Sequence, residues 1–188
     1  ITVVDFNLDE DPSPPGCNGR TNWFWAWQAW GACQDYYGLC YTRDRIIEFR
    51  ETIHEHFDPH FDHFTGVHSL YDMFMTLFTF WHHSCRDQAM SHFYALLLNV
   101  ASGRMNTYEV ISDDGATVAQ AIAYIDELLQ QNDHDADRLA LGLARAINWE
   151  WVTLPAGYIP LDMPQIAYKA GNDQTPDVYF LSQNYPNP

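Results

Sequence analysis

The chain has 188 residues, 47% of them hydrophobic and 15% aromatic, which suits one compact domain with a substantial core. Its 25 acidic residues outnumber its 9 basic ones, for a formal net charge of -16. This charge argues against nucleic acid and anionic membranes as partners, because both attract clustered Lys and Arg, and it favours cations, Ca²⁺ included. No apolar run approaches the roughly 20 residues that span a bilayer, so we expect no membrane span.

The distribution of helical periodicity, proline and acidic residues predicts a mainly α fold, a compact bundle of about five helices with extended arms. Residues 1–22 are expected to form an acidic, Pro-rich arm that opens with an edge-strand pattern at 2–6. Residues 23–151 are the predicted helical domain, and the prolines of 152–188 predict a second extended arm. We expect both arms to lie against the body or against a neighbouring copy.

The first run of the helical domain holds four tryptophans, Trp23, Trp25, Trp27 and Trp30. Four are too many for one buried face, so we expect part of the run to meet another surface. In a helix Trp23, Trp27 and Trp30 share a face, whereas in a strand Trp23, Trp25 and Trp27 do. The run fits core and interface packing or, alternatively, a platform on which sugar rings stack.

Five further segments carry the apolar spacing of amphipathic helices. We expect them at 43–57, 69–83, 86–102, 116–131 and 136–149. Thr42 is the predicted N-cap of the first, and Gly103 is predicted to end the third.

Histidines concentrate around the junction of the first two of these segments. His54, His56, His60, His63 and His68 alternate with Asp58, Asp62 and three phenylalanines, and His82 and His83 follow the next apolar run. A zinc or copper site needs three or four such ligands at about 2.0–2.3 Å, and these residues are the candidates. The alternative is a structural or pH-sensitive polar seam between packed aromatic surfaces.

A smaller acidic cluster precedes the last predicted helix. Asp133, Asp135 and Asp137 have the spacing that opens an EF-hand calcium loop, but the Gly and the Glu that should follow are missing. Acidic residues at a helix start also complement the helix dipole, which explains the cluster without calcium.

No complete catalytic motif accompanies these clusters. Ser84 and Ser91 lie near histidines without a nucleophile elbow around them, and no phosphate-binding loop occurs. The sequence indicates no reaction and favours a non-enzymatic role.

Cysteine usage predicts an extracellular, disulfide-stapled fold. Cys17, Cys33, Cys40 and Cys85 allow three pairings, and the sequence does not choose between them, although one local bridge could staple the loop from Cys33 to Cys40. An even cysteine number, few lysines and a start on Ile1 rather than Met are typical of a processed protein in an oxidising setting.

The C-terminal residues carry a recognisable phrase, Gln183, Asn184, Tyr185, Pro186, Asn187 and Pro188. It resembles the opening of the C-terminal sorting domain of bacterial proteins secreted by the type IX system. The resemblance implies export and cell-surface attachment. It also implies that the sorting domain that would follow is cleaved, truncated or left out of the structure.

The body resembles a group of secreted bacterial helical domains of unknown activity. The stretch Leu98, Asn99, Val100, Ala101, Ser102 and Gly103 is similar to their characteristic helix end, and Cys17 with residues 22–25 is similar to part of their cysteine-containing phrase. The group implies an extracellular helical domain and supplies no catalytic residues.

These features favour a secreted structural or assembly subunit, a surface, fibre or tube protein whose partners are copies of itself, with bound metal as a stabiliser. One alternative is an extracellular metal-binding module or metal-dependent enzyme that uses the cluster from His54 to His68. A second is a carbohydrate-binding module whose tryptophan run, Trp23 to Trp30, stacks on cell-surface polysaccharide.

Overall fold

The structure, a computed structural model, describes residues 20–36, 39–57, 60–78, 84–149 and 153–166. In these ranges the chain forms six α-helices and one short 3-10 helix, and its β-type pairing is limited to two isolated bridges. The prediction of a mainly α fold is confirmed. Six helices form rather than about five because the tryptophan run, for which a strand was an open alternative, is itself helical.

The elements follow one another in the order α1 (Asn22–Cys33), α2 (Arg43–His56), the 3-10 helix η1 (Asp62–Phe64), α3 (Leu70–Leu77), α4 (Cys85–Ala101), α5 (Val118–Gln130) and α6 (His134–Trp149). Hydroxyl side chains set the starts of the first five α-helices, each accepting a hydrogen bond from a backbone N–H of the first turn: Thr21, Thr42, Ser69, Ser84 and Thr117. The N-cap predicted at Thr42 is confirmed.

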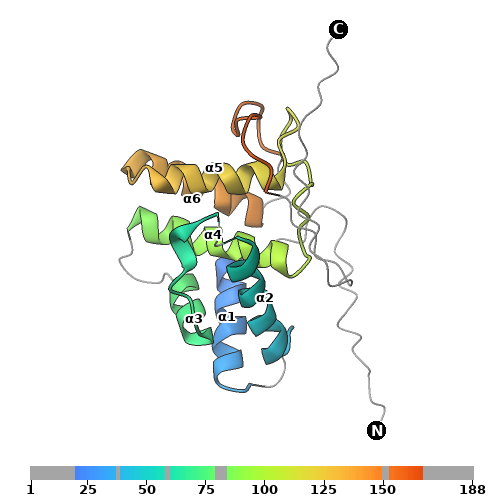
Figure 1. Ribbon diagram of the computed structural model, residues 1–188, viewed down its shortest axis with the longest axis vertical. Helices are drawn as coiled ribbons and strands as arrows, with labels where there is room; N and C mark the ends of the chain where they lie inside the picture. Colours follow the sequence, from blue (N-terminus) through green and yellow to red (C-terminus); the bar gives the residue numbers. More distant parts are fainter. Residues whose placement is uncertain (1–19, 37–38, 58–59, 79–83, 150–152, 167–188) are drawn as a thin grey trace.

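Helix α4 occupies the centre of the fold. In Figure 1 it crosses the molecule between the α5–α6 pair above and α1, α2 and α3 below. Every residue from Phe93 to Ala101 is buried, as expected of a helix that is packed on all sides. Helix α6 lies along α4, and α1 lies along α3. None of the described helices combines the length and apolarity that crossing a membrane requires, as the sequence predicted.

The described part of the predicted C-terminal arm, residues 153–166, packs onto the body. The N–H of Leu154 donates to the carbonyl of Ile111 at 2.7 Å, and Nε2 of Gln120 donates to the carbonyl of Leu161 at 2.6 Å. Ile159 is buried beside them. Residues 167–188 and 1–19, with the edge strand expected at 2–6, lie outside the described residues.

A single buried amide joins three parts of the chain. Oδ1 of Asn99 accepts hydrogen bonds from the backbone N–H of Arg20 at 2.8 Å and from Nε1 of Trp25 at 2.9 Å. Its Nδ2 donates to the carbonyl of Arg20 at 2.9 Å and to Oδ1 of Asn148 at 2.8 Å. Asn99 has no exposed surface, and every hydrogen-bonding position of its amide is used.

The same stretch ends α4. Gly103 adopts a φ of 75°, the left-handed conformation that favours glycine after a helix, so the predicted helix end is confirmed. The hydroxyl of Ser102 and the N–H of Met105 both donate to the carbonyl of Asn99. Asn99, Ser102 and Gly103, which belong to the stretch that resembles the helix end of secreted helical domains, therefore stabilise and end α4 in this structure.

The predicted disulfide staple is corrected by the structure. Cys33, Cys40 and Cys85 are free thiols, and Cys17 lies outside the described residues. The side chain of Leu39 packs closely against Gly31 of α1, since a Cβ added to Gly31 would stand 2.5 Å from Cδ2 of Leu39. Burial raises the pKa of Cys33, against a smaller opposite effect of Arg43, so this thiol stays protonated and is poorly reactive towards disulfides.

We predict that Asn99→Asp lowers the free energy of unfolding by about 2–4 kcal/mol, because a carboxylate would face the Arg20 carbonyl and the Asn148 amide oxygen with no proton to donate. Urea unfolding followed by circular dichroism measures the change. The matched variant Asn106→Asp changes an exposed asparagine and should shift stability by less than about 1 kcal/mol. Equal stability of Asn99→Asp and the parent chain would contradict the assignment.

Candidate functional site

The most prominent surface feature is an aromatic face formed by α1 and α3. We define the aromatic face by residues of α1 and residues in or just after α3: Trp23, Trp27, Trp30, Tyr71, Phe74, Met75 and Phe78. Trp27 is 63% exposed, Trp23 38%, Tyr71 55% and Met75 50%. Large apolar side chains exposed together on one face are typical of interaction sites.

Helical periodicity produces the face. Trp23, Trp27 and Trp30 recur at the spacing that places side chains on one side of a helix, and the remaining tryptophan, Trp25, points to the opposite side. Trp25 is fully buried and its ring stacks on Tyr41, with centroids 5.5 Å apart and planes 9° from parallel. The four tryptophans are thus divided between core and surface, as the helical alternative predicts.

Ring contacts between the two helices pack the face into one layer. The rings of Trp23 and Phe78 meet edge to face at 5.6 Å, and those of Trp30 and Phe74 lie 5.0 Å apart. Phe74 and Phe78 stack at 4.9 Å. These contacts fix the orientations of the side chains at the edges of the face, which reduces the entropy lost when a partner binds.

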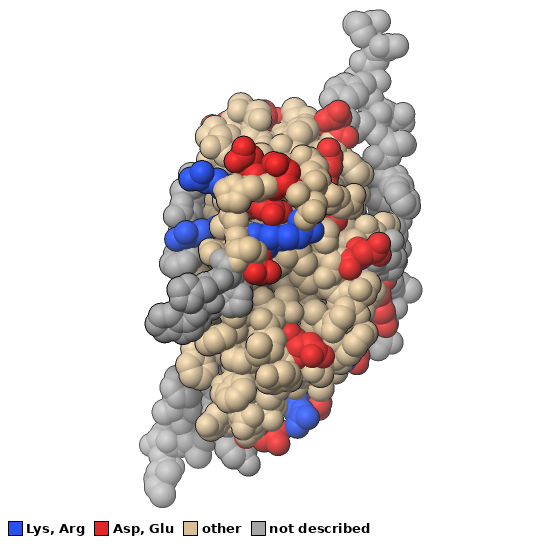
Figure 2. Space-filling model, turned by 90° about the vertical axis from the view of Figure 1, so that its left-hand side faces the viewer, with Lys and Arg blue, Asp and Glu red and all other residues tan. Residues whose placement is uncertain are grey.

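The aromatic face is almost free of charge in a strongly acidic chain. Helix α1 contains no charged residue, and the only one in α3 is Asp72. The two amide side chains of α1, Asn22 and Gln28, are buried, and they hydrogen-bond to Ser91 and to the N–H of Tyr41. In Figure 2 the densest group of charged side chains lies over the upper half of the view, whereas the lower half, where α3 lies, is mostly uncharged surface with scattered acidic side chains and one basic patch.

The histidine run divides into buried phenylalanines and outer histidines. Phe57, Phe61 and Phe64 have at most 1% exposure. Phe61 and Phe64 pack against Phe93 of α4, Phe64 also contacts Tyr94, and Phe57 stacks on Phe61. Of the intervening side chains, His60, Asp62 and His68 are exposed, and His54, His56 and His63 are half-buried. The run is therefore an aromatic anchor to α4, with its polar members towards the surface.

Two of the histidines have separate structural partners. Nε2 of His54 lies 2.6 Å from the carbonyl of Val67, and its ring is stacked 6.1 Å from that of His68. Nε2 of His63 lies 2.8 Å from Oδ1 of Asp126 on α5, and both side chains are almost buried. Nε2 of His63 and Oδ1 of Asp126 are close but do not meet the geometry of a hydrogen bond. Neither atom has a hydrogen-bond partner among the described residues. The polar seam considered for this run matches these contacts.

The described candidates for zinc or copper do not converge. No three His, Cys, Asp or Glu side chains within the described ranges form a group that could hold a metal ion. The candidates Asp58, His82 and His83 lie outside those ranges, so the metal site stays a prediction that depends on them.

The calcium candidates are also used separately. Oδ2 of Asp133 accepts hydrogen bonds from the N–H groups of Asp135 and Ala136, which caps α6. Oδ1 of Asp137 lies 3.1 Å from Nη1 of Arg86, while Asp135 points into solvent. This arrangement matches the helix-start explanation of the cluster.

The two serines near histidines are likewise structural. The hydroxyl of Ser84 caps α4, and that of Ser91 is buried and donates to the carbonyl of Leu77 at 2.8 Å. The aromatic face can bind a partner non-covalently through stacking and apolar contact.

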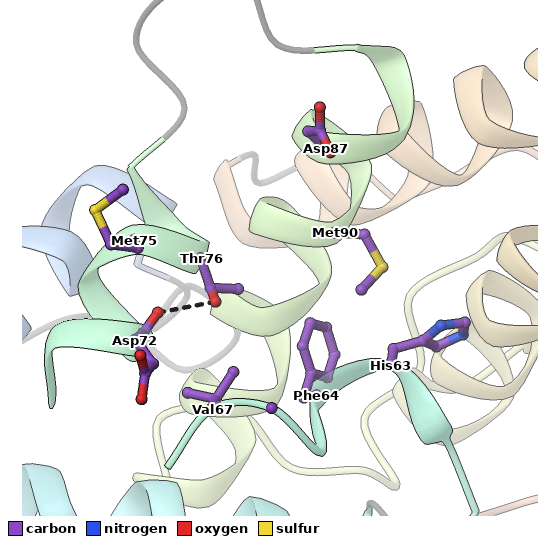
Figure 3. Close-up of a pocket in the computed structure, with 9 residues that line it drawn as sticks. His63, Phe64, Val67, Asp72, Met75, Thr76, Asp87 and Met90 are labelled. Carbon is purple, nitrogen blue, oxygen red and sulfur yellow. Dashed lines mark hydrogen bonds between the residues drawn. The ribbon is translucent and has the colours of Figure 1, made fainter. Parts of the chain in front are cut away.

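A pocket adjoins the aromatic face. It is a hollow of about 500 Å³ between α3, α4 and the loop after η1, and Met75 belongs both to it and to the face. Figure 3 shows Asp72 and Met75 on α3, Asp87 and Met90 on α4, and Phe64 on the loop side. Sequence reasoning did not find this pocket, because it arises only where the three segments meet. The sequence does contain a sign of the two helix starts beside the pocket. Each start has the capping-box pattern, Ser69-x-x-Asp72 for α3 and Ser84-x-x-Asp87 for α4.

His92 on α4 is a second feature, which the sequence suggests only as a further ligand for the histidine cluster. Burial of the ring, assisted by the nearby charge of Arg145, lowers the pKa of His92 from 6.5 to about 4. No described residue forms a hydrogen bond to its Nδ1. This histidine is therefore neutral in the folded protein at pH 5 and above, whereas in an unfolded chain it would be mostly protonated below its ordinary pKa of 6.5.

Comparison of the chain with protein-family models, with curated proteins and with solved structures finds no match.

We predict that His92 makes the fold acid-sensitive between pH 6.5 and 4. In this range unfolding takes up a proton at His92, so the free energy of unfolding falls as the pH falls, by up to about 3 kcal/mol at about 1.4 kcal/mol per pKa unit. His92→Gln should flatten this part of the stability profile in urea unfolding across pH. His134→Gln, which changes a histidine whose side chain is 76% exposed, should leave the profile unchanged. Parallel profiles for His92→Gln and the parent chain would refute the prediction.

Proposed function

We propose that the chain is an extracellular assembly subunit that packs its aromatic face against another copy of itself. The observation that carries the proposal is the position of Trp27, 63% exposed at the centre of a helix without charged residues. An indole exposed to this extent leaves a large apolar surface in water, and packing it against a second apolar surface is favourable.

The charge distribution supports a second copy as the partner. Two chains of net charge -16 repel each other, and the repulsion is smallest where the facing surfaces hold few carboxylates. The aromatic face is such a surface. A contact around Trp27 and Tyr71 would keep most acidic side chains of both copies in solvent.

The polar composition of the face favours a protein partner over a sugar. Sugar hydroxyls need hydrogen-bonding side chains beside the stacking rings, since hydroxyls buried without partners are costly. On α1 the amides that could serve, Asn22 and Gln28, are buried and already bonded. Carbohydrate binding by stacking on the tryptophans is the second candidate function of the same residues.

The extracellular location is supported by the C-terminal phrase, Gln183 to Pro188, which resembles the start of a type IX sorting domain. It is tested by expressing the gene with its native flanking sequence in a bacterium that has this secretion system. The protein should appear at the cell surface or in the medium, and retention in the cytoplasm would contradict the location.

Sedimentation over micromolar to millimolar concentrations tests the self-association. A stable interface buries about 800 Å² per partner, and four large exposed side chains supply only part of that area, so association should be weak. It should strengthen with added salt, because salt screens the repulsion between two acidic chains and leaves apolar contact intact. An association that weakens with salt would indicate a charged interface instead.

We predict that Trp27→Ser abolishes this association without unfolding the chain, because the side chain is mostly exposed. The matched control is Tyr158→Ser, which removes an aromatic side chain of 50% exposure outside the aromatic face and should leave association intact. A chain that stays monomeric at millimolar concentration would overturn the proposal. If that monomer also bound insoluble polysaccharide through Trp27, the carbohydrate-binding module would replace it, and stoichiometric zinc or copper in elemental analysis would favour the metal-binding module.

A further inference from the structure

We propose that the pocket between α3 and α4 binds a primary alkylammonium group, as found on free polyamines and on lysine side chains. The inference is independent of the proposed self-association, since it concerns a different surface and a different ligand. It starts from a hollow of about 500 Å³, a volume sufficient for a small ligand.

The charge of the pocket lining favours a cationic ligand. Two carboxylates, Asp72 and Asp87, line the pocket, and its lining contains no Lys or Arg. In Figure 3 they stand on different helices on either side of the hollow. A hydrogen bond from the Ser69 hydroxyl lowers the pKa of Asp72, which keeps this carboxylate ionised. The net charge of -16 adds a general attraction for cations.

The apolar part of the lining selects a ligand with a hydrocarbon stem. Met75 is half-exposed and Met90 is half-buried, and both line the pocket beside Val67. Thioether side chains are flexible and polarizable, so they adapt to alkyl groups of different shape. A ligand whose methylene groups contact Met75 and Met90 can bring an ammonium group to one of the two carboxylates, which Figure 3 shows at different ends of the hollow.

Other ligand classes fit less well. A bare metal ion would need three or more converging ligands, and the described residues include no such group. An anion would meet two carboxylates, and an uncharged apolar ligand would leave them unused. The chain contains a single lysine, Lys169, so an external amine is the occupant to test.

Binding is measured by NMR on the methionine methyl groups, with the whole chain and four probes at constant ionic strength. The probes are cadaverine, spermidine, lysine blocked at its amino and carboxyl ends, and the uncharged pentane-1,5-diol. We expect saturable shifts of the Met75 and Met90 methyl signals with the amines and none with the diol. Tighter binding of spermidine identifies a free polyamine as the source, and tighter binding of blocked lysine identifies a protein side chain.

Two sets of variants test the geometry. Asp72→Asn and Asp87→Asn keep an oxygen that can accept the capping hydrogen bonds, and each should weaken cadaverine binding about threefold, as for an exposed ion pair. The control is Asp62→Asn, an exposed carboxylate outside the pocket lining, which should leave binding unchanged. Gly66→Leu should abolish binding while the thermal midpoint stays the same, because a Cβ at this lining residue meets nothing within 4 Å and the new side chain fills the hollow.

Three results would overturn the proposal. They are shifts with the diol equal to those with cadaverine, unchanged binding in both Asp→Asn variants, and binding that persists in a folded Gly66→Leu chain. Loss of self-association in Trp27→Ser with amine binding intact would confirm that the pocket and the aromatic face act separately.

Discussion

The buried amide of Asn99 fixes how the helices sit on α4. Most contacts of α4 are apolar, and apolar contacts alone tolerate small slides of one helix along another. Asn99 removes that freedom, because displacing α1 or α6 would leave a buried amide without partners, at a cost of a few kcal/mol. Its bonds to Arg20, Trp25 and Asn148 connect residues up to 79 positions apart in the chain. One side chain thereby determines the placement of three segments.

The aromatic face follows from this constraint. Once Nε1 of Trp25 is bonded to Asn99, the rotation of α1 about its axis is set, and Trp27 must point away from the core. A second buried bond, from Asn22 to Ser91, holds the start of α1 against α4 in the same rotation. The core therefore sets which side of α1 faces outward, and the rings of Trp23 and Trp30 on that side pack against Phe78 and Phe74.

Much of the fold was predictable from the sequence, and the exceptions have physical causes. The spacing of Ile46, Ile47, Phe49, Arg50 and Ile53 predicts the inner side of α2. Ile46, Phe49 and Ile53 are buried, and Ile47 and Arg50 are half-buried. The tryptophan run fits helical and extended periods alike; in the structure the Thr21 N-cap and the bond of Trp25 to Asn99 accompany the helical form. The spacing of the histidines could not show that the phenylalanines between them turn inward, since that depends on α4. Cysteine counts could not show whether thiols approach, because bridge geometry depends on backbone positions that the sequence does not give.

The contrast between an uncharged α1 and an acidic remainder has a consequence for the behaviour of the protein in acid. The isoelectric point is near 4.6, so repulsion between copies disappears as the solution is acidified towards that value. Over the same range the free energy of unfolding falls, because the pKa of His92 is about 4 in the folded protein and unfolding takes up a proton there. Colloidal stability and conformational stability thus decline together. At neutral pH the acidic surface opposes contact between the exposed tryptophans of two copies, and this opposition is weakest near pH 4.6.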